Sequence, residues 1–223
     1  IMGVLNYVQY CRERTNEDDP RHSRLVKAES ELRRCERIVR GMLTSASAGT
    51  QQAVVRRSPV ECRAAVERAV DLLAGGIDAA GARLDVAVPA GLPPCNADPD
   101  WLQQVLINLI SNAEDAVAEQ DDKRIVVDAL LEEGFIRFLV TDTGCGMSLE
   151  TQQKAAEPFY TTKPVGQGTG LGMTISRNFV TKLGGKMRID SRLGEGTTVG
   201  FTVPVWDAGE EEMPGEVTHD KAA

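Results

Sequence analysis

The stretch from Asp142 to Gly172 organises the rest of this chain. It opens with Asp142-Thr143-Gly144-Cys145-Gly146-Met147 and closes with Gly166-Gln167-Gly168-Thr169-Gly170-Leu171-Gly172. Glycines carry no β-carbon, so the backbone of the closing run can approach a bulky anion and adopt positive φ where a turn needs it. A helical pattern follows at once, and the unpaired N–H groups of a first helical turn make a ready phosphate site. The stretch therefore predicts a phosphate-binding loop.

Between the two glycine clusters lies Pro158-Phe159-Tyr160-Thr161-Thr162-Lys163. It offers hydroxyl donors and an ammonium in a segment too rich in Pro and Gly to be a core element, which indicates a mobile lid. A glycine-rich turn alone is common, but here three patterns occur together and in order. A P-loop is excluded because no Gly-Lys-Ser/Thr closes the run. A Rossmann fingerprint would need a strand ending in the first glycine and an acid about 20 residues later.

Length and composition limit the classes of function. With 223 residues and 42% hydrophobic content, the chain can bury one main core plus an appendage. The net charge of −8 and an acidic tail from residue 207 to 223 argue against nucleic-acid binding. Five cysteines without a Cys-x-x-Cys pair indicate neither zinc nor disulfides, and they favour the cytoplasm. No apolar run is long enough for a membrane span, so no membrane contact is expected from this chain, although missing upstream regions could anchor the full protein.

Two helices are expected at the start of the chain. Residues 1 to about 17 have a helical pattern, and Asp19 can cap a second helix whose first residue is Pro20. Apolar residues of this second helix follow a heptad spacing: Leu25, Ala28, Leu32, Cys35, Val39 and Met42. Two helices expose more apolar surface than they can cover for each other, so residues 1–43 are predicted to form a homodimeric four-helix bundle. The alternative is a hairpin folded back on its own domain.

The remaining periodicity predicts an α/β domain. The expected divisions are a helical hairpin (1–49), a linker (50–57), an α/β domain that carries the predicted phosphate-binding loop (58–206) and a disordered acidic tail (207–223). The expected elements are a short strand at Val54 and Val55, a helix capped by Ser58-Pro59 and ending at Leu73, a strand over 83–88, a helix from Asp98-Pro99-Asp100, strands over 125–131 and 135–140, a helix over 171–183, and strands over 186–191 and 197–205.

Two asparagines stand out on the helix that starts near Asp98. Asn108 and Asn112 are four residues apart, so they lie on the same flank of its apolar stripe. Asparagine is a poor helix former because its amide competes with the backbone. A neutral side-chain oxygen held on a helix suits Mg²⁺, which takes few protein ligands and keeps its waters and substrate phosphates. The alternative is a pair of solvated or locally bonded amides.

Taken in order, these motifs closely resemble the conserved boxes of sensor histidine kinases in the GHKL superfamily. The lid sequence is most similar to that of the nitrogen-regulator class of these kinases. The resemblance covers residues 1 to about 205. It implies the Bergerat fold, an α/β sandwich of a mixed sheet and a helical layer, with ATP between the helices and the lid and a dimerisation hairpin in front. The motifs are Asn108-x-x-x-Asn112, Asp142-x-Gly144-x-Gly146, Phe159 with Thr-Thr-Lys, Gly168-x-Gly170-x-Gly172 and Gly194-x-Gly196-Thr197.

The resemblance also implies roles for single residues. Asp142 accepts the adenine amino group, Asn112 binds Mg²⁺, and Lys163 reaches the terminal phosphates. Asn108, Asn112 and Lys163 form the expected catalytic set, with Asn112 as the metal ligand. The expected nucleotide contacts are Asn108, Asn112, Asp142, Gly144, Gly146, Phe159, Thr161, Thr162, Lys163, Gly168, Thr169, Gly170, Leu171, Gly172 and Thr197.

The chain departs from the family pattern in two places. Many members carry Lys or Arg three residues after the second asparagine, whereas this chain has Asp115, which puts a phosphate contact from that helix in doubt. The family's phosphoacceptor histidine, in a His-Glu-x-x-Asn-Pro context, is expected directly before Ile1. His22 and His219 lack that context, so the chain is expected to bind nucleotide without autophosphorylation.

The function implied is transfer of the ATP γ-phosphoryl to a histidine and then to an aspartate of a response-regulator receiver domain. One alternative is an ATPase of the same fold, of the gyrase, mismatch-repair or chaperone type. Such ATPases carry a glutamate one helical turn before the metal-binding asparagine as a general base. Asn108 occupies that position and cannot take a proton, which disfavours hydrolysis. The other alternative is a non-catalytic, nucleotide-sensing dimer scaffold.

Overall fold

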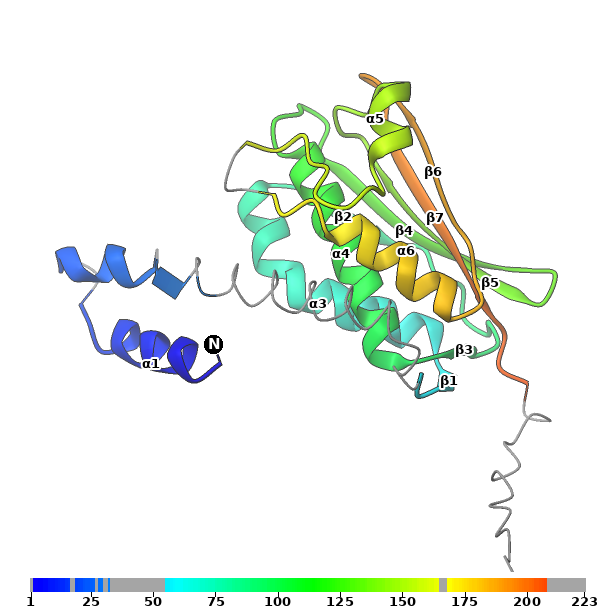
Figure 1. The fold of residues 1–223 in the computed structure, drawn as a ribbon, viewed down its shortest axis with the longest axis horizontal. Helices are drawn as coiled ribbons and strands as arrows, with labels where there is room; N and C mark the ends of the chain where they lie inside the picture. Colours follow the sequence, from blue (N-terminus) through cyan, green and yellow to red (C-terminus); the bar gives the residue numbers. More distant parts are fainter. Residues whose placement is uncertain are drawn as a thin grey trace, which may run out of the picture.

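The computed structural model describes residues 2–16, 19–26, 28–29, 32, 55–164 and 168–207. A five-stranded sheet in the order β2-β4-β5-β7-β6 and a separate two-stranded pair β1-β3 form the strand framework (Figure 1). The strands are β1 (Ser58–Val60), β2 (Arg83–Val86), β3 (Cys95–Ala97), β4 (Arg124–Glu132), β5 (Phe135–Asp142), β6 (Met187–Arg192) and β7 (Gly196–Pro204). The helices are α1 (Met2–Glu13), α3 (Cys62–Ala80), α4 (Pro99–Val117), α5 (Leu149–Lys154) and α6 (Gly172–Lys182).

The sheet is mixed, and one of its faces carries the helical layer. β2 runs parallel to β4, and the other neighbours in the sheet are antiparallel. Helices α3, α4 and α6 lie against this face (Figure 1). Alternate residues of the strands point into the core between the two layers, where Phe138 of β5 and Phe201 of β7 stack with ring centroids 5.0 Å apart. The α/β sandwich expected from the sequence is confirmed.

Helix α4 is the buried element at the centre of the helical layer. Its inward stripe is fully buried: Leu102, Val105, Leu106, Leu109, Ile110, Ala113 and Val117. Asp98 caps it by accepting hydrogen bonds from the N–H groups of Asp100 (3.1 Å) and Trp101 (3.2 Å), with Pro99 in the first turn. Because the start of the helix is set by this cap, the direction in which each later side chain points follows from the sequence.

The expected helix cap at Ser58-Pro59 is wrong. These residues belong to β1, where Pro59 lies opposite Asn96 of β3. The helix starts at Cys62 with Glu61 as its cap, and it continues through Gly75-Gly76 to Ala80 instead of ending at Leu73. Proline suits a strand at a sheet edge as well as the first turn of a helix, so the dipeptide alone could not distinguish the two.

Other differences concern short elements. Val55 is not in a strand, and Val54 lies outside the described residues. Strand β3 and helix α5 were not expected, because three and six residues are too few to show a period in the sequence. The hairpin of β4 and β5 through Glu133-Gly134, and the end of α6 before Gly184 with φ of +83°, agree with the sequence.

The amino-terminal residues contain two helical segments. α1 ends at Glu13, earlier than expected, and residues 20–26 are helical with Asp19 accepting the N–H of Arg21 at 2.8 Å, as the cap expectation required. Arg12 and Gln9 of α1 contact the buried Glu29 carboxylate at 2.7 and 3.2 Å, so the two segments lie side by side. Cys35, Val39, Met42, the linker residues 44–53 and the tail beyond Asp207 lie outside the described residues. Among the helices that are described, none has the length and apolarity of a membrane span.

Candidate functional site

One face of α4 brings the sequence motifs together. Asn108, Asn112 and Ala116 follow each other at intervals of four residues, which places them on one stripe about 12 Å long. Asn108 contacts the start of α6, Asn112 contacts the lid at Lys163, and Ala116 contacts the loop after Asp142. Three segments that are far apart in the sequence therefore meet along successive turns of a single helix.

Asp142 ends β5 and is buried, with 7% of its surface exposed. Its Oδ1 accepts the N–H of Gly144 at 2.8 Å. Burial raises the pKa of Asp142 above its ordinary value, and N–H groups of Gly144 and Thr197 oppose that shift. A β-carbon on Gly144 would lie 2.6 Å from that of Ala116, so only glycine lets this loop pack on α4.

The turn between β6 and β7 supports the same loop. Gly146 has φ of +64°, and a β-carbon there would collide with the carbonyl oxygen of Arg192. The Ser191 hydroxyl accepts the N–H of Met147 at 2.8 Å and donates to the carbonyl oxygen of Gly196 at 2.9 Å. It also lies 2.8 Å from the hydroxyl of the buried Thr197. Ser191 thus holds the Asp142 loop against the hairpin.

Asn108 ties α4 to the first turn of α6. Its Nδ2 donates to the carbonyl oxygen of Gly172 and to the hydroxyl of Ser176, both at 3.3 Å. Its Oδ1 accepts from Gln104 Nε2 at 3.0 Å. The side chain is therefore bonded to protein both within α4 and across to α6, and its place beside the phosphates stays a prediction. The hydrogen bonds of Asn108 set the position of the glycine-rich segment relative to α4.

Asn112 and Asp115 face the lid one helical turn further along. Asn112 Oδ1 accepts from Lys163 Nζ at 3.4 Å, and the same ammonium forms an ion pair with the Asp115 carboxylate. Glu114 lies next to this pair. Burial is the main cause that raises the pKa of Glu114, and the negative charge of Asp115 raises it further. The positive charge of Lys163 opposes this shift. The Lys163 ammonium therefore contacts side-chain oxygen atoms of two α4 residues, Asn112 and Asp115.

The lid segment (residues 158–163) packs against the glycine-rich segment that follows it. Phe159 N donates to the carbonyl oxygen of Gly170 at 3.0 Å, and the backbones are so close that a β-carbon on Gly170 would collide with Phe159. Gly168 packs in the same way on the Thr161 hydroxyl. Phe159 has φ of +67° and a largely exposed side chain. The Thr161 hydroxyl accepts the N–H of Lys163, and the Thr169 hydroxyl accepts the N–H of Leu171. Thr162 is exposed. Gly166 and Gln167 lie outside the described residues.

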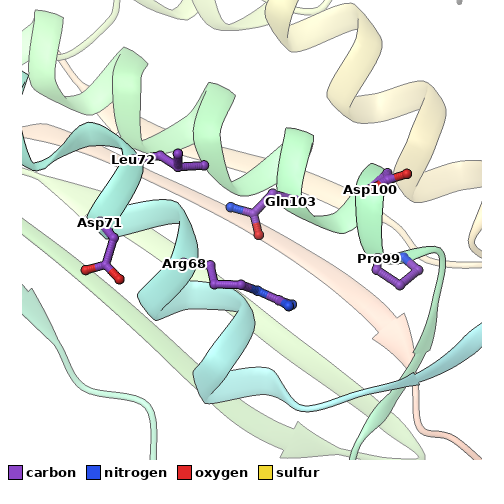
Figure 2. Close-up of a pocket in the computed structure, with 6 residues that line it drawn as sticks. All are labelled: Arg68, Asp71, Leu72, Pro99, Asp100 and Gln103. Atoms are coloured by element: carbon purple, nitrogen blue, oxygen red, sulfur yellow. The ribbon is translucent and has the colours of Figure 1, made fainter.

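A groove of about 440 Å³ lies elsewhere, between α3 and α4. Figure 2 shows that Gln103 projects from α4 toward α3 in this groove. Its Nε2 is buried and has no hydrogen-bond partner within the described part of the chain. The lining contains none of the predicted site residues: Arg68, Asp71, Leu72, Pro99, Asp100 and Gln103.

Comparisons with known proteins identify the family of the domain that carries this site. Residues 97–207 match the family "Histidine kinase-, DNA gyrase B-, and HSP90-like ATPase". Histidine protein kinase DivJ of Caulobacter vibrioides is 36% identical over 154 residues, which are 68% of this chain and 26% of that protein. The chain carries a sensor histidine kinase ATPase domain. Sensor histidine kinase ZraS of Klebsiella oxytoca is 28% identical over 207 residues, 92% of this chain and 43% of that protein.

Solved structures show the same fold for the kinase domain. The catalytic domain of histidine kinase ThkA, in a nucleotide-free form, superimposes with a TM-score of 0.60 at 25% identity and covers 67% of this chain and 96% of that one. Full-length ShkA in complex with AMPPNP has a TM-score of 0.75 at 24% identity and covers 91% of this chain and 43% of that one. The Bergerat sandwich expected from the resemblance is confirmed. The chain spans less than half of the curated relatives DivJ and ZraS.

Several residues that organise the candidate site were not predicted from the sequence. Ala116 continues the four-residue spacing of the two asparagines, a signal that could have indicated a third contact on the same face. Gln104 precedes Asn108 by the same interval. Ser191 carries no comparable signal, because the contact that ties it to the Asp142 loop is with Met147, 44 residues away in the sequence. Asp115 was noticed as a departure, but its pairing with Lys163 was not foreseen.

Proposed function

We propose that this chain is the ATP-binding and dimerisation core of a two-component sensor histidine kinase. In this role it moves the γ-phosphoryl of Mg-ATP to a histidine, from which it passes to an aspartate of a response-regulator receiver domain. The observation that carries the proposal is the stripe of α4, where Asn108, Asn112 and Ala116 bring the glycine-rich segment, the lid and the Asp142 loop together. The kinase family match over residues 97–207 supports it independently.

Asp142 is proposed to recognise adenine. A buried carboxylate accepts an N–H bond more strongly than an exposed one, and the exocyclic amine of adenine supplies such a donor. Gly144 lets the loop pack closely on α4 and Gly146 lets it pack on the β6–β7 turn, and neither adds a side chain that would obstruct the base. The remaining predicted contacts, including Thr197 next to Asp142 in the β5–β7 pairing, belong to the same proposal.

Asn112 is proposed to hold Mg²⁺. Its Oδ1 already faces a cation, the Lys163 ammonium, so the position suits a positively charged ligand. A bound Mg²⁺ would neutralise charge on the phosphates during transfer. Lys163 carries a compact charge on a flexible stem, and it can reach the terminal phosphates from the lid.

Positioning is the main contribution that the protein makes to phosphoryl transfer. The glycine-rich segment enters α6 at Gly172, where the first N–H groups of the helix lack intrahelical partners. Asn108 fixes the distance of this turn from α4. Since the polar atoms of Asn108 are engaged with protein and an amide cannot act as a base, hydrolysis by water is disfavoured as the main reaction.

Dimerisation is proposed through residues 1–43. In the single chain, apolar side chains of the described helical segments remain exposed to water: Val4, Tyr7, Tyr10 and Val26. A second copy that packs its own hairpin on this surface would complete a four-helix bundle. Residues 50–57 then act as the linker to an ATP-binding domain over 58–206, followed by the acidic tail 207–223, and the cytoplasm is the proposed location.

Labelled ATP tests the proposed reaction. The chain alone should bind Mg-ATP, and Asn112→Ala should abolish the enhancement of affinity by Mg²⁺. It should form no acid-labile phosphoprotein, because neither His22 nor His219 stands in a phosphoacceptor context. The same chain extended upstream by its natural sequence through a His-Glu-x-x-Asn-Pro segment should take up label. In the extended chain, phosphate release without label would indicate an ATPase, and nucleotide binding with neither label nor phosphate release would indicate a nucleotide-sensing scaffold.

A further inference from the structure

Asp115 puts a negative charge beside the proposed phosphate site. It lies three residues after Asn112 on α4, so both side chains face the lid. A carboxylate next to a triphosphate is unfavourable unless a cation lies between them. In this structure that cation is Lys163, whose ammonium contacts the Asp115 carboxylate and Asn112 Oδ1 together.

We propose that Asp115 is a positioning residue that docks Lys163 on Asn112 in the nucleotide-free protein, so that Mg-nucleotide must displace this contact in order to bind. The proposal rests on the proposed function for the nucleotide, but the docked state itself requires no ligand. It assigns to Asp115 a role in setting nucleotide affinity through Lys163.

The contacts around Lys163 suit an exchangeable pair. The side chains of Lys163 and Asp115 are 33% and 51% exposed, and water screens an ion pair of this exposure, so it can be broken at small cost. The backbone of Lys163 has a separate anchor, its N–H bond to the Thr161 hydroxyl at 3.2 Å. The ammonium can therefore turn from α4 to a phosphate by rotation of its own stem, which leaves the adjoining backbone held by this exposed hydrogen bond and more open to amide exchange.

Displacement follows from the chemistry of Asn112. The Lys163 ammonium uses the same Oδ1 that a divalent cation would need, and two cations cannot share that oxygen at contact distance. A contact made only in the free protein lowers the apparent affinity of the ligand that breaks it. Loss of the Asp115 charge should therefore raise nucleotide affinity, by about threefold for a pair of this exposure.

Hydrogen exchange in the absence of nucleotide tests the docked state directly. Asp115→Asn and Lys163→Met should each accelerate exchange of the Phe159 and Lys163 amides, and the double variant should not exceed the single ones. Asp115→Glu should restore slow exchange. Glu119→Gln is the matched control, because it removes the same charge just beyond the end of α4, and it should change nothing.

Calorimetry with an unhydrolysable ATP analogue and Mg²⁺ tests the consequence. Asp115→Asn should tighten binding about threefold, and the gain should shrink by more than half in the Lys163→Met background. Unchanged amide exchange in Asp115→Asn would overturn the proposal, as would weaker Mg²⁺-dependent binding, which would make Asp115 a metal ligand. If the parent chain binds no nucleotide while the exchange results hold, the docking of Lys163 by Asp115 stands and the proposed function fails.

Discussion

At the scale of the residue, Asp142 is a buried carboxylate that is also proposed to bind the nucleotide. The loop after β5 covers its carboxylate, and the Gly144 N–H is bonded to one of its oxygens. Its ionised form costs folding energy, since burial raises its pKa. The same ionised form is the one proposed to accept a hydrogen bond from adenine. Stability and binding therefore place opposite demands on this side chain.

Asp142→Asn should weaken nucleotide binding about tenfold or more, because a charge-assisted hydrogen bond contributes roughly 1.5–3 kcal/mol. Calorimetric titration measures the change. The variant should also be more stable than the parent at neutral pH. A group whose pKa is raised in the folded state adds stability below its unfolded pKa, and that stability is lost as the pH rises through the folded pKa.

The pH dependence of binding gives a second measurement on the same variant. In the parent chain, affinity should fall on acidification through the raised pKa of Asp142, at a higher pH than an ordinary aspartate with pKa 3.8 would give. Asp142→Asn should lose this acidic limb and retain only the titration of the nucleotide itself. An identical pH profile in both proteins would remove Asp142 from the binding site.

A comparison of Gly146 with Gly194 distinguishes the cost of a left-handed backbone from the cost of a steric collision. Both have positive φ, +64° and +82°, but a β-carbon on Gly194 meets open space whereas one on Gly146 meets the Arg192 carbonyl. Gly194→Ala should cost about 1–2 kcal/mol of unfolding free energy from the left-handed conformation alone. Gly146→Ala should cost roughly 1–3 kcal/mol more and should also reduce nucleotide affinity. Equal costs in urea denaturation would show that the collision is relieved.

At the scale of the element, the segment before β1 holds the ends of two helices. Arg57 donates to the carbonyl oxygens of Leu183 (3.2 Å) and Lys182 (3.0 Å) at the end of α6. The neighbouring Arg56 donates through its backbone N–H to Asp98, the cap of α4. Asn108 and Asn112 lie further along α4, and Gly172 begins α6, so the segment holds the ends of these helices that are remote from the proposed nucleotide site.

Arg57→Ala should lower the unfolding free energy by about 1 kcal/mol, because the last carbonyls of a helix lose a cationic partner. Arg56→Ala is the matched control. It removes the same charge but keeps the N–H group that bonds Asp98. Thermal or urea unfolding of both variants measures the difference. Equal effects would show that net charge, and not the contact with the end of α6, determines the loss.

At the scale of the whole molecule, the proposed dimer depends on the apolar seam of the second helical segment. Leu25 and Leu32 are partly buried in the single chain, whereas Val26 is 43% exposed. The contact of Glu29 with Gln9 and Arg12 joins the two helical segments of one chain. The remaining apolar surface is available to a second copy.

Leu32→Glu should dissociate the dimer, because an unpaired charge in an apolar interface is costly. Light scattering at micromolar concentration should show a dimer for the parent and a monomer for the variant. Ser23→Glu introduces the same charge at an exposed position of the same segment and should leave the dimer intact. A parent chain that is monomeric under these conditions would contradict dimerisation through residues 1–43.

Elements with a long hydrophobic period were predictable from the sequence by itself. α4 and α6 each bury one stripe over several turns, and the β4–β5 and β6–β7 hairpins alternate along most of their length. Local signals added the ends, as with the Asp98 cap of α4 and Gly184 after α6. The motifs of the proposed nucleotide site were also visible, because their glycines and polar residues are unusual within a short stretch.

Only the tertiary structure decided the features that depend on a distant partner. Ser58-Pro59 can start a helix or form an edge strand, and it forms β1 because β3 lies beside it. Asn108 bonds α6, Ala116 supports the Asp142 loop, and Asp115 pairs with Lys163 across the lid. No local preference encodes such pairings. They arise when packing on the sheet brings one face of α4 against three separate segments, which is why the sequence indicates candidate residues for the site but not the contacts that place them.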